Sequence, residues 1–256
     1  LYWRSQDGGS TWDIKDLQVP GSDSAFFLDV DADAYAIDAR GNTVAFVMFN
    51  QFADVVLFKS TDNGDNWTRT IVNDFPIDKF DIANDLDINN NGVADDSTET
   101  CDGSGALVLD SNDKAHVFYG NFEIFDDSYG DGTFSVLLNS NGIRYWNENN
   151  PTATPVIIAE APDVNNDGAI SVEGNSFQTG IGDYVQKSLS TFPTAGIDAD
   201  GNIYLCYSAH MENLSNGIQN YRHLFLTSSD DGGNSWEDPI DANPSFEFQE
   251  CVFPSM

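Results

Sequence analysis

The chain has 256 residues, and its 10 Lys and Arg stand against 42 Asp and Glu, which gives a formal net charge of −32. A surface with this charge repels phosphate backbones and anionic lipid headgroups, so we expect no nucleic-acid partner. No apolar run reaches the roughly 20 residues that a membrane span needs, so we expect no membrane insertion. The three cysteines form no C-x-x-C pair, which argues against a structural zinc site.

One eight-residue pattern, S-x-D-x-G-x-x-W, occurs three times. Each copy follows a run of alternating apolar residues, so each predicts a tight turn that closes a β-hairpin. The Asp and Ser side chains can accept from backbone N–H groups of the turn, the glycine permits positive φ, and the Trp can cover the hairpin. The copies comprise Ser5, Asp7, Gly9 and Trp12; Ser60, Asp62, Gly64 and Trp67; and Ser229, Asp231, Gly233 and Trp236.

A longer repeat surrounds these turns. Residues 36–42 (AIDARGN) match residues 196–202 (GIDADGN), residues 108–113 are a looser third copy, and an alternating strand follows each of them. Together with the hairpins closed by the S-x-D-x-G-x-x-W turns, this makes four antiparallel strands in a unit of roughly 50 to 90 residues, which is the pattern of a β-propeller blade.

The spacing predicts one all-β domain, a β-propeller over residues 1–256 with about four blades' worth of sequence. A degenerate turn at 138–146 is expected to close the last hairpin of the third blade. Because the chain opens and closes in the middle of a blade, we interpret it as part of a larger propeller. The blades are expected at 1–17 (partial), 33–73, 105–148 and 192–240, with the next one starting at 251–256.

The blade positions also predict two different faces. Short turns join the first strand to the second and the third to the fourth, on one face of the disc. The long segments are expected on the opposite face, and elaborated loops on a rigid scaffold are where binding sites usually lie. The long segments are 18–32, 74–104, 120–132, 149–191 and 209–222.

The S-x-D-x-G-x-x-W turns resemble the Asp boxes (BNR repeats) of sialidase-like β-propellers, which also occur in secreted bacterial surface proteins. The resemblance implies that Asp7, Asp62 and Asp231 are structural residues remote from any active site. Sialidases hold the sugar carboxylate with three arginines, the first of them in an F/Y-R-I-P motif. The comparable stretches here, 192–194 and 253–255, lack that arginine, and only five arginines are present.

Two of the long segments carry a second motif, in which oxygen-bearing side chains alternate before a glycine. This spacing can converge on one Ca²⁺ ion, because the glycine permits the bend and a later carboxylate completes the oxygen cage. The loops resemble those of EF-hand, dockerin and thrombospondin type 3 repeats; the alternative is an Asx-rich turn without an ion. The candidate ligands are Asp85, Asp87, Asn89, Asn91 and Asp95 in one loop, and Asp163, Asn165, Asp167 and Glu173 in the other.

The function predicted from the sequence is a secreted or cell-surface binding module, stabilised by Ca²⁺, that takes a glycan or a protein on its long-loop face. Catalysis by this chain is not expected. Resemblance to large secreted bacterial proteins, including cargo of type 9 secretion, implies contact with secretion or surface-anchoring machinery. The alternative is a sialidase-like glycoside hydrolase whose catalytic arginines lie outside this segment.

Overall fold

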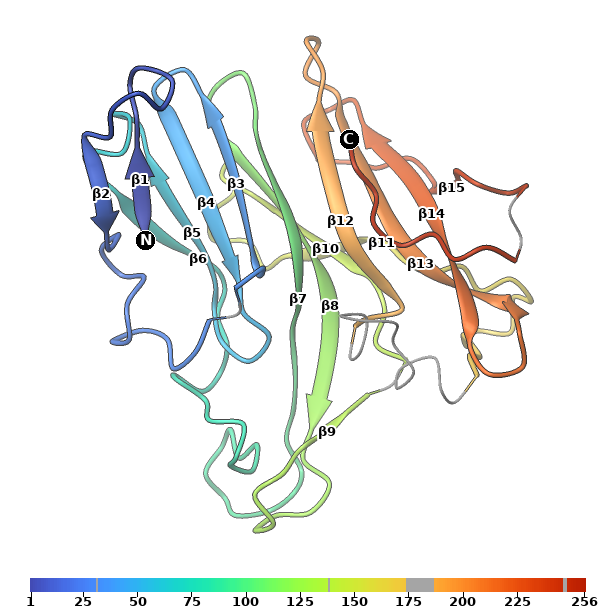
Figure 1. The fold of residues 1–256 in the computed structure, drawn as a ribbon. Helices are drawn as coiled ribbons and strands as arrows, with labels where there is room; N and C mark the ends of the chain where they lie inside the picture. Colours follow the sequence, from blue (N-terminus) through green and yellow to red (C-terminus); the bar gives the residue numbers. More distant parts are fainter. Residues whose placement is uncertain (31, 138, 174–186, 246–247) are drawn as a thin grey trace.

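The computed structural model describes residues 1–30, 32–137, 139–173, 187–245 and 248–256. All regular elements in these ranges are β-strands, and they form four antiparallel sheets that stand side by side in chain order (Figure 1). Within the same ranges, no helix has the length and apolar character needed to cross a membrane. Residues 174–186, which belong to the predicted long segment 149–191, lie outside the described part.

The first two sheets hold the N-terminal third of the chain. The first sheet has two strands, β1 (Tyr2–Arg4) and β2 (Ile14–Leu17), and the second has four strands in sequence order. The strands of the second sheet are β3 (Tyr35–Arg40), β4 (Thr43–Phe49), β5 (Val55–Ser60) and β6 (Thr68–Asn73). These four strands lie within the stretch 33–73.

The third sheet is longer than expected at both ends. Its strands run in the order β11-β10-β8-β7, and the short β9 pairs with the end of β8. It therefore extends from Ser97 to Ala159 instead of from 105 to 148, and the predicted insertion 74–104 contains the start of its first strand. The strands are β7 (Ser97–Leu109), β8 (Ala115–Phe125), β9 (Ser135–Val136), β10 (Ile143–Asn147) and β11 (Val156–Ala159).

The prediction of a hairpin turn at 138–146 is wrong. Residues from Ile143 to Asn147 form the third strand, which pairs with β8, and the connection to β11 is residues 148–155. The strand forms because Ile143 and Tyr145 alternate into the core between this sheet and the next. Trp146 faces the other way, and packs against the second sheet instead of covering a turn.

The fourth sheet contains β12 (Ser190–Ile197), β13 (Ile203–Ser215), β14 (Asn220–Ser229) and β15 (Ile240–Asp241), again in sequence order. The loop expected over 209–222 is mostly strand, because β13 and β14 continue outward and only residues 216–219 connect them. Such an extended hairpin satisfies the backbone hydrogen bonds that a long loop would leave to solvent.

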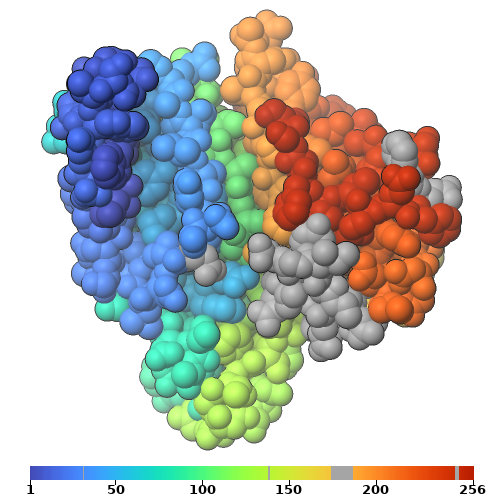
Figure 2. Space-filling model, in the orientation of Figure 1, coloured from blue at the N-terminus to red at the C-terminus, as the bar shows by residue number. Residues whose placement is uncertain are grey.

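The two predicted faces are present. In Figure 1 the β3–β4, β7–β8 and β12–β13 turns lie at the upper end of the sheets, and the long connections lie at the lower end. There the segments 74–96 and 126–134 lie against each other, as Figure 2 shows in teal and yellow-green. Asp85 fastens them, since its carboxylate accepts the amides of Gly130 and Gly132 at 2.9 and 2.8 Å. We call the end with the long connections the loop face.

The core lies between successive sheets, and alternation along each strand decides which core a side chain enters. On β8, Val117 and Tyr119 pack toward the second sheet, whereas Phe118 packs toward the fourth. Tyr119 and Phe118 are fully buried (0% exposed), and burial of a side chain of this size contributes roughly 1.5 to 3 kcal/mol. The third sheet is therefore held on both of its faces.

The three S-x-D-x-G-x-x-W turns, hereafter the boxes, contain the same hydrogen bonds. In the second box the Ser60 hydroxyl donates to Asp62 (2.7 Å) and accepts the amide of Gly64 (2.8 Å). The Asp62 carboxylate accepts the side-chain and backbone amides of Asn66 (2.7 and 2.9 Å), and these bonds lower its pKa to about 2. The network recurs at Ser5 with Asp7 and at Ser229 with Asp231.

Two of the boxes are also covered by a tyrosine of the preceding sheet. The ring of Tyr2 on β1 lies 5.1 Å from that of Trp67, and the space above Gly64 is filled by the same tyrosine. Tyr145 on β10 lies 5.2 Å from Trp236 in the same manner. These boxes therefore join neighbouring sheets as well as closing hairpins.

Substitution of the box glycines tests this contact. Gly9 and Gly233 have nearly equal φ values of 89° and 90°, so replacement by Ala costs each about 1 to 2 kcal/mol in backbone strain. A Cβ at Gly233 would in addition overlap Tyr145, whereas Gly9 has no atom within 4 Å. We expect Gly233→Ala to lose about 1 to 3 kcal/mol more than Gly9→Ala in urea unfolding. Equal losses would contradict the contact.

Candidate functional site

A cavity of about 770 Å³ opens on the loop face, where the first strands of the second, third and fourth sheets meet. Three of its walls come from these strands or from the chain just before them. In chain order they are formed by residues 32–34, 103–105 and 192–194. Gln51, Lys187, Phe253 and Pro254 complete the described lining. Its size is in the range of small-molecule sites.

Bulges in two strands shape this cavity. The pairing register shifts between Cys101 and Gly105 on β7, and between Thr191 and Thr194 on β12. Bulges bend a strand and redirect side chains, and they are frequent beside functional sites. Within the second bulge Phe192 has φ of 52°, a conformation that costs a non-glycine residue of order 1 to 3 kcal/mol.

Asp102, in the first bulge, is fully buried (0% exposed). One carboxylate oxygen accepts the amide and hydroxyl of Ser104 (2.9 and 2.6 Å), and the other accepts the Thr191 hydroxyl of β12 (2.5 Å). Gly120 on β8 lies beneath it, and a Cβ there would overlap the carboxylate. Asp102 therefore links β7 to β12 and is a structural residue below the cavity floor.

The backbone of the same bulge holds two polar side chains of the lining. The carbonyl oxygen of Asp102 accepts from Lys187 Nζ (2.6 Å) and from Gln51 Nε2 (2.9 Å). Gly103 makes this approach possible, because a Cβ would lie 3.1 Å from the Gln51 side chain and 3.3 Å from Lys187 Nζ. Lys187 also lies 5.8 Å from the centre of the Phe192 ring.

Two phenylalanines form the apolar part of the cavity. The rings of Phe192 and Phe253 meet edge to face, with centroids 5.0 Å apart, and Phe253 is 65% exposed. An exposed ring beside hydroxyl, amide and ammonium groups offers both stacking and hydrogen bonds to a ligand.

The described lining does not bring together a pair of carboxylates for acid–base hydrolysis. Among the described lining residues Asp33 is the only carboxylate, and both oxygens of Asp102 are engaged. All five arginines are described and none lines the cavity. Arg222 is 2% exposed and donates to the backbone oxygens of Ser188 and Leu189. The arrangement is suited to binding.

The first predicted cation loop is a compact turn on the loop face. The Asp87 carboxylate accepts the amides of Asn91 (2.9 Å) and Gly92 (3.1 Å), and the Asn91 side chain donates to Asp95 (3.2 Å). The side-chain amide of Asn89 also donates to Asp95. Asp85 points out of the loop toward residues 130–132, so the structure does not bring it together with the other four candidates.

The second loop has the same backbone turn. The Asp163 carboxylate accepts the amide of Gly168 at 2.8 Å, and Asn165 accepts the amide of Asp167 at 2.8 Å. Oxygens of Asp163, Asp167 and Glu212 lie within 4.8 Å of one another. Two oxygens that bind a Ca²⁺ ion from opposite sides, each about 2.4 Å from the ion, are about 4.8 Å apart. The spacing of these three carboxylates therefore fits a Ca²⁺ ion.

Glu212 is the site residue that the sequence did not reveal. It belongs to β13, where its carboxylate accepts the amides of Val164 (3.1 Å) and Ser171 (3.0 Å). The predicted ligand Glu173 lies outside this carboxylate group, and its amide donates to Asn220. Its hydrogen bonds to the loop come from a strand more than 40 residues further along the chain, and no local motif marks it.

No protein-family model and no curated protein matches this chain. Among solved structures it is similar to a thermostable family-43 glycoside hydrolase (13% identity, 82% of this chain, 52% of that protein, TM-score 0.35). It is also similar to Trypanosoma rangeli sialidase (13% identity, 80% of this chain, 30% of that protein, TM-score 0.37). A third similar structure is leech intramolecular trans-sialidase (12% identity, 81% of this chain, 43% of that protein, TM-score 0.39). The chain thus spans about half or less of the length of these proteins.

The structural role of Asp102 can be tested by Asp102→Asn. The side-chain amide of Asn would place an N–H donor against a hydroxyl group that now donates to the carboxylate, so one donor would be left without an acceptor. We therefore expect a loss of about 2 to 3 kcal/mol in the free energy of unfolding. Asp127→Asn, at an exposed position of the loop face, is the control and should change it by less than about 0.5 kcal/mol. Unchanged stability of the Asp102 variant would contradict the assignment.

Proposed function

We propose that this chain is part of a β-propeller of a secreted or cell-surface protein, and that it binds a glycan in the loop-face cavity. In this proposal the second, third and fourth sheets are each one blade. The observation that carries it is Phe192, which is held at φ of 52° with its ring against Phe253 at the cavity wall. Strain of this kind persists where the surrounding structure enforces it, and it is concentrated at functional sites.

The chemistry of the cavity supports a sugar ligand. A sugar ring has an apolar face that can lie on an exposed aromatic ring, and hydroxyl groups that both donate and accept. Phe253 supplies the ring, while Gln51, Thr194 and Lys187 supply the polar groups. Binding is proposed instead of hydrolysis because Asp33 is the one carboxylate of the described lining.

We further propose that Ca²⁺ stiffens the loops beside this site. The stronger candidate consists of Asp163, Asp167 and Glu212, because strand β13 holds the third carboxylate against the loop. Like charges this close repel one another, and a bound cation would remove that repulsion. The loop with Asp87, Asn89, Asn91 and Asp95 is the second candidate.

The glycan proposal predicts that Phe253→Ala weakens sugar binding at least tenfold. The reason is loss of the stacking surface, and the measurement is calorimetric titration with the strongest hit of a glycan array. Phe248→Ala is the matched control, because Phe248 is 64% exposed and belongs to a different aromatic pair, with Tyr221. It should bind like the wild type.

Two outcomes would contradict this proposal. One is equal affinity of Phe253→Ala and the wild type for the same glycan. The other is turnover of a fluorogenic sialoside by this chain alone, which would instead support a sialidase-like hydrolase.

The calcium proposal predicts that EDTA lowers the melting temperature and that added Ca²⁺ restores it. Asp167→Asn and Glu212→Gln should each lose most of this response, because each removes one of the three converging carboxylates. Asp200→Asn, in the exposed β12–β13 turn at the opposite end, should keep the full response. An identical melting curve with and without chelator would refute the site.

A further inference from the structure

The loop-face cavity takes its exposed ring from a segment outside the sheets. Phe253 lies in residues 248–256, which belong to no strand, and Figure 2 shows this part of the chain in dark red over the fourth sheet. A side chain in such a segment keeps its place only if the backbone beside it is attached to the sheet. Hydrogen bonds at Glu250 and Cys251 provide this attachment. We call residues 250–253 the strap.

Both of these bonds go to Arg222, the third residue of β14. Its backbone N–H donates to the Glu250 carboxylate at 2.9 Å, and its backbone oxygen accepts the amide of Cys251 at 2.9 Å. The Ser208 hydroxyl on β13 donates to the backbone oxygen of Cys251 at 3.3 Å. The strap therefore lies against two strands of the fourth sheet before it reaches the cavity.

The same arginine also holds the start of β12. Its guanidinium donates to the backbone oxygens of Ser188 and Leu189 at 3.0 and 3.2 Å, just before the strand that carries Phe192. The rings of Phe192 and Phe253, with centroids 5.0 Å apart, thus belong to two segments that are bonded to one residue. The geometry of this aromatic pair depends on both sets of bonds.

Glu250 provides the one bond of the strap to Arg222 that comes from a side chain. Arg222 is 2% exposed, so its amide depends on this carboxylate for an acceptor while the strap is in place. A buried N–H without an acceptor destabilises the protein, so loss of the carboxylate favours a state in which the strap has moved and water reaches the amide. One residue, Val252, separates the attached Cys251 from Phe253, so the ring moves with the strap.

We propose that Glu250 is a positioning residue of the cavity: its carboxylate holds the strap on β14 and keeps the Phe253 ring beside Phe192, where the ring can stack on a sugar. This inference rests on the proposed glycan site and extends it to a residue outside the described cavity lining. Burial raises the pKa of Glu250, so a neutral amide that accepts the same bond should hold the strap at least as well as the carboxylate.

The first measurement follows the ring itself and needs no ligand. 4-Fluorophenylalanine at position 253 gives one ¹⁹F NMR signal, whose chemical shift contains the ring current of Phe192. In Glu250→Ala we expect this signal to move toward its position in Phe192→Leu, because the ring leaves its partner. Glu250→Gln should leave the signal unchanged. Glu250 belongs to no strand, so both of its variants should fold.

The second measurement is calorimetric titration with the array glycan used for Phe253→Ala. Glu250→Ala should weaken this glycan about fivefold, because the ring no longer stays beside Phe192. Glu250→Gln should restore the affinity to within about twofold of the wild type, because its side-chain oxygen accepts the same amide. In the Phe253→Ala background Glu250→Ala should have no further effect, since the ring that it positions is gone.

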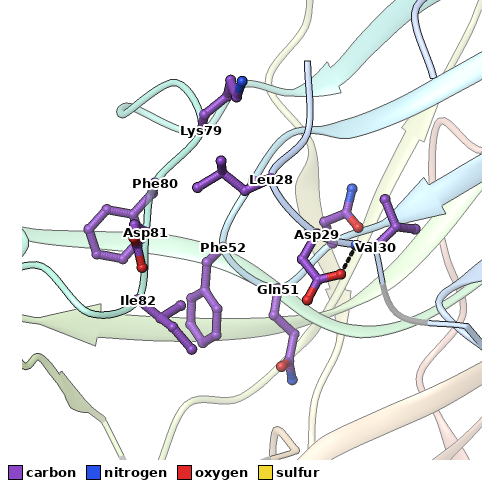
Figure 3. A pocket seen from close by; sticks show the side chains of 11 residues that line it. Leu28, Asp29, Val30, Gln51, Phe52, Lys79, Phe80, Asp81 and Ile82 are labelled. Atoms are coloured by element: carbon purple, nitrogen blue, oxygen red, sulfur yellow. Dashed lines mark hydrogen bonds between the residues drawn. The ribbon is translucent and has the colours of Figure 1, made fainter. Parts of the chain in front are cut away.

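Asp29→Ala is the matched control. The Asp29 carboxylate also accepts a backbone amide, that of Val30 at 2.9 Å, in a smaller pocket of the loop face (Figure 3). Val30 is 42% exposed, so water can replace this acceptor, and the bond holds no part of the strap. The variant removes one carboxylate, as Glu250→Ala does, and should keep both the wild-type affinity and the wild-type ¹⁹F signal.

A ¹⁹F signal that does not respond to Glu250→Ala overturns the proposal. Failure of Glu250→Gln to restore the affinity also overturns it, as do losses that multiply in the double variant. Equal affinity of Phe253→Ala and the wild type is a different result. It contradicts the glycan site, while the ¹⁹F signal still decides whether Glu250 positions the ring.

Discussion

The burial of the third sheet on both of its faces is the constraint on which the rest of the structure depends. Phe118 and Tyr119 are neighbours on β8, yet they belong to the cores on opposite sides of the sheet. A sheet buried in this way cannot shift its register by one residue without exchanging the two cores. Its edges and ends therefore keep fixed positions, and the first strands of three sheets meet at one place.

The boxes extend this constraint to the hairpin turns. In each of them a serine and an aspartate satisfy the turn amides, so the turn needs no partner from solvent. Tyr2 and Tyr145 then occupy the space that the glycines of two boxes leave open. The boxes thus stabilise the hairpin turns and join neighbouring sheets without using any residue of the cavity lining.

The repeat pattern predicted the strands and the two faces because alternation and turn chemistry are local properties. It misplaced the third strand of the third sheet. A glycine followed by aromatic residues, as at 140–146, is compatible with a turn and with the start of a strand, so the local pattern does not distinguish the two. Asp102, Lys187 and Glu212 were missed for a common reason. Each acquires its role from residues more than 40 positions away, through hydrogen bonds to a bulge or to a distant loop, and no local pattern records such a contact.

A strained backbone lies at the wall of the loop-face cavity. Phe192 has a φ of 52° there, within the bulge of β12 that shapes the cavity. Gln51 is held by the carbonyl oxygen of Asp102, so this part of the cavity wall has its position set before a ligand binds.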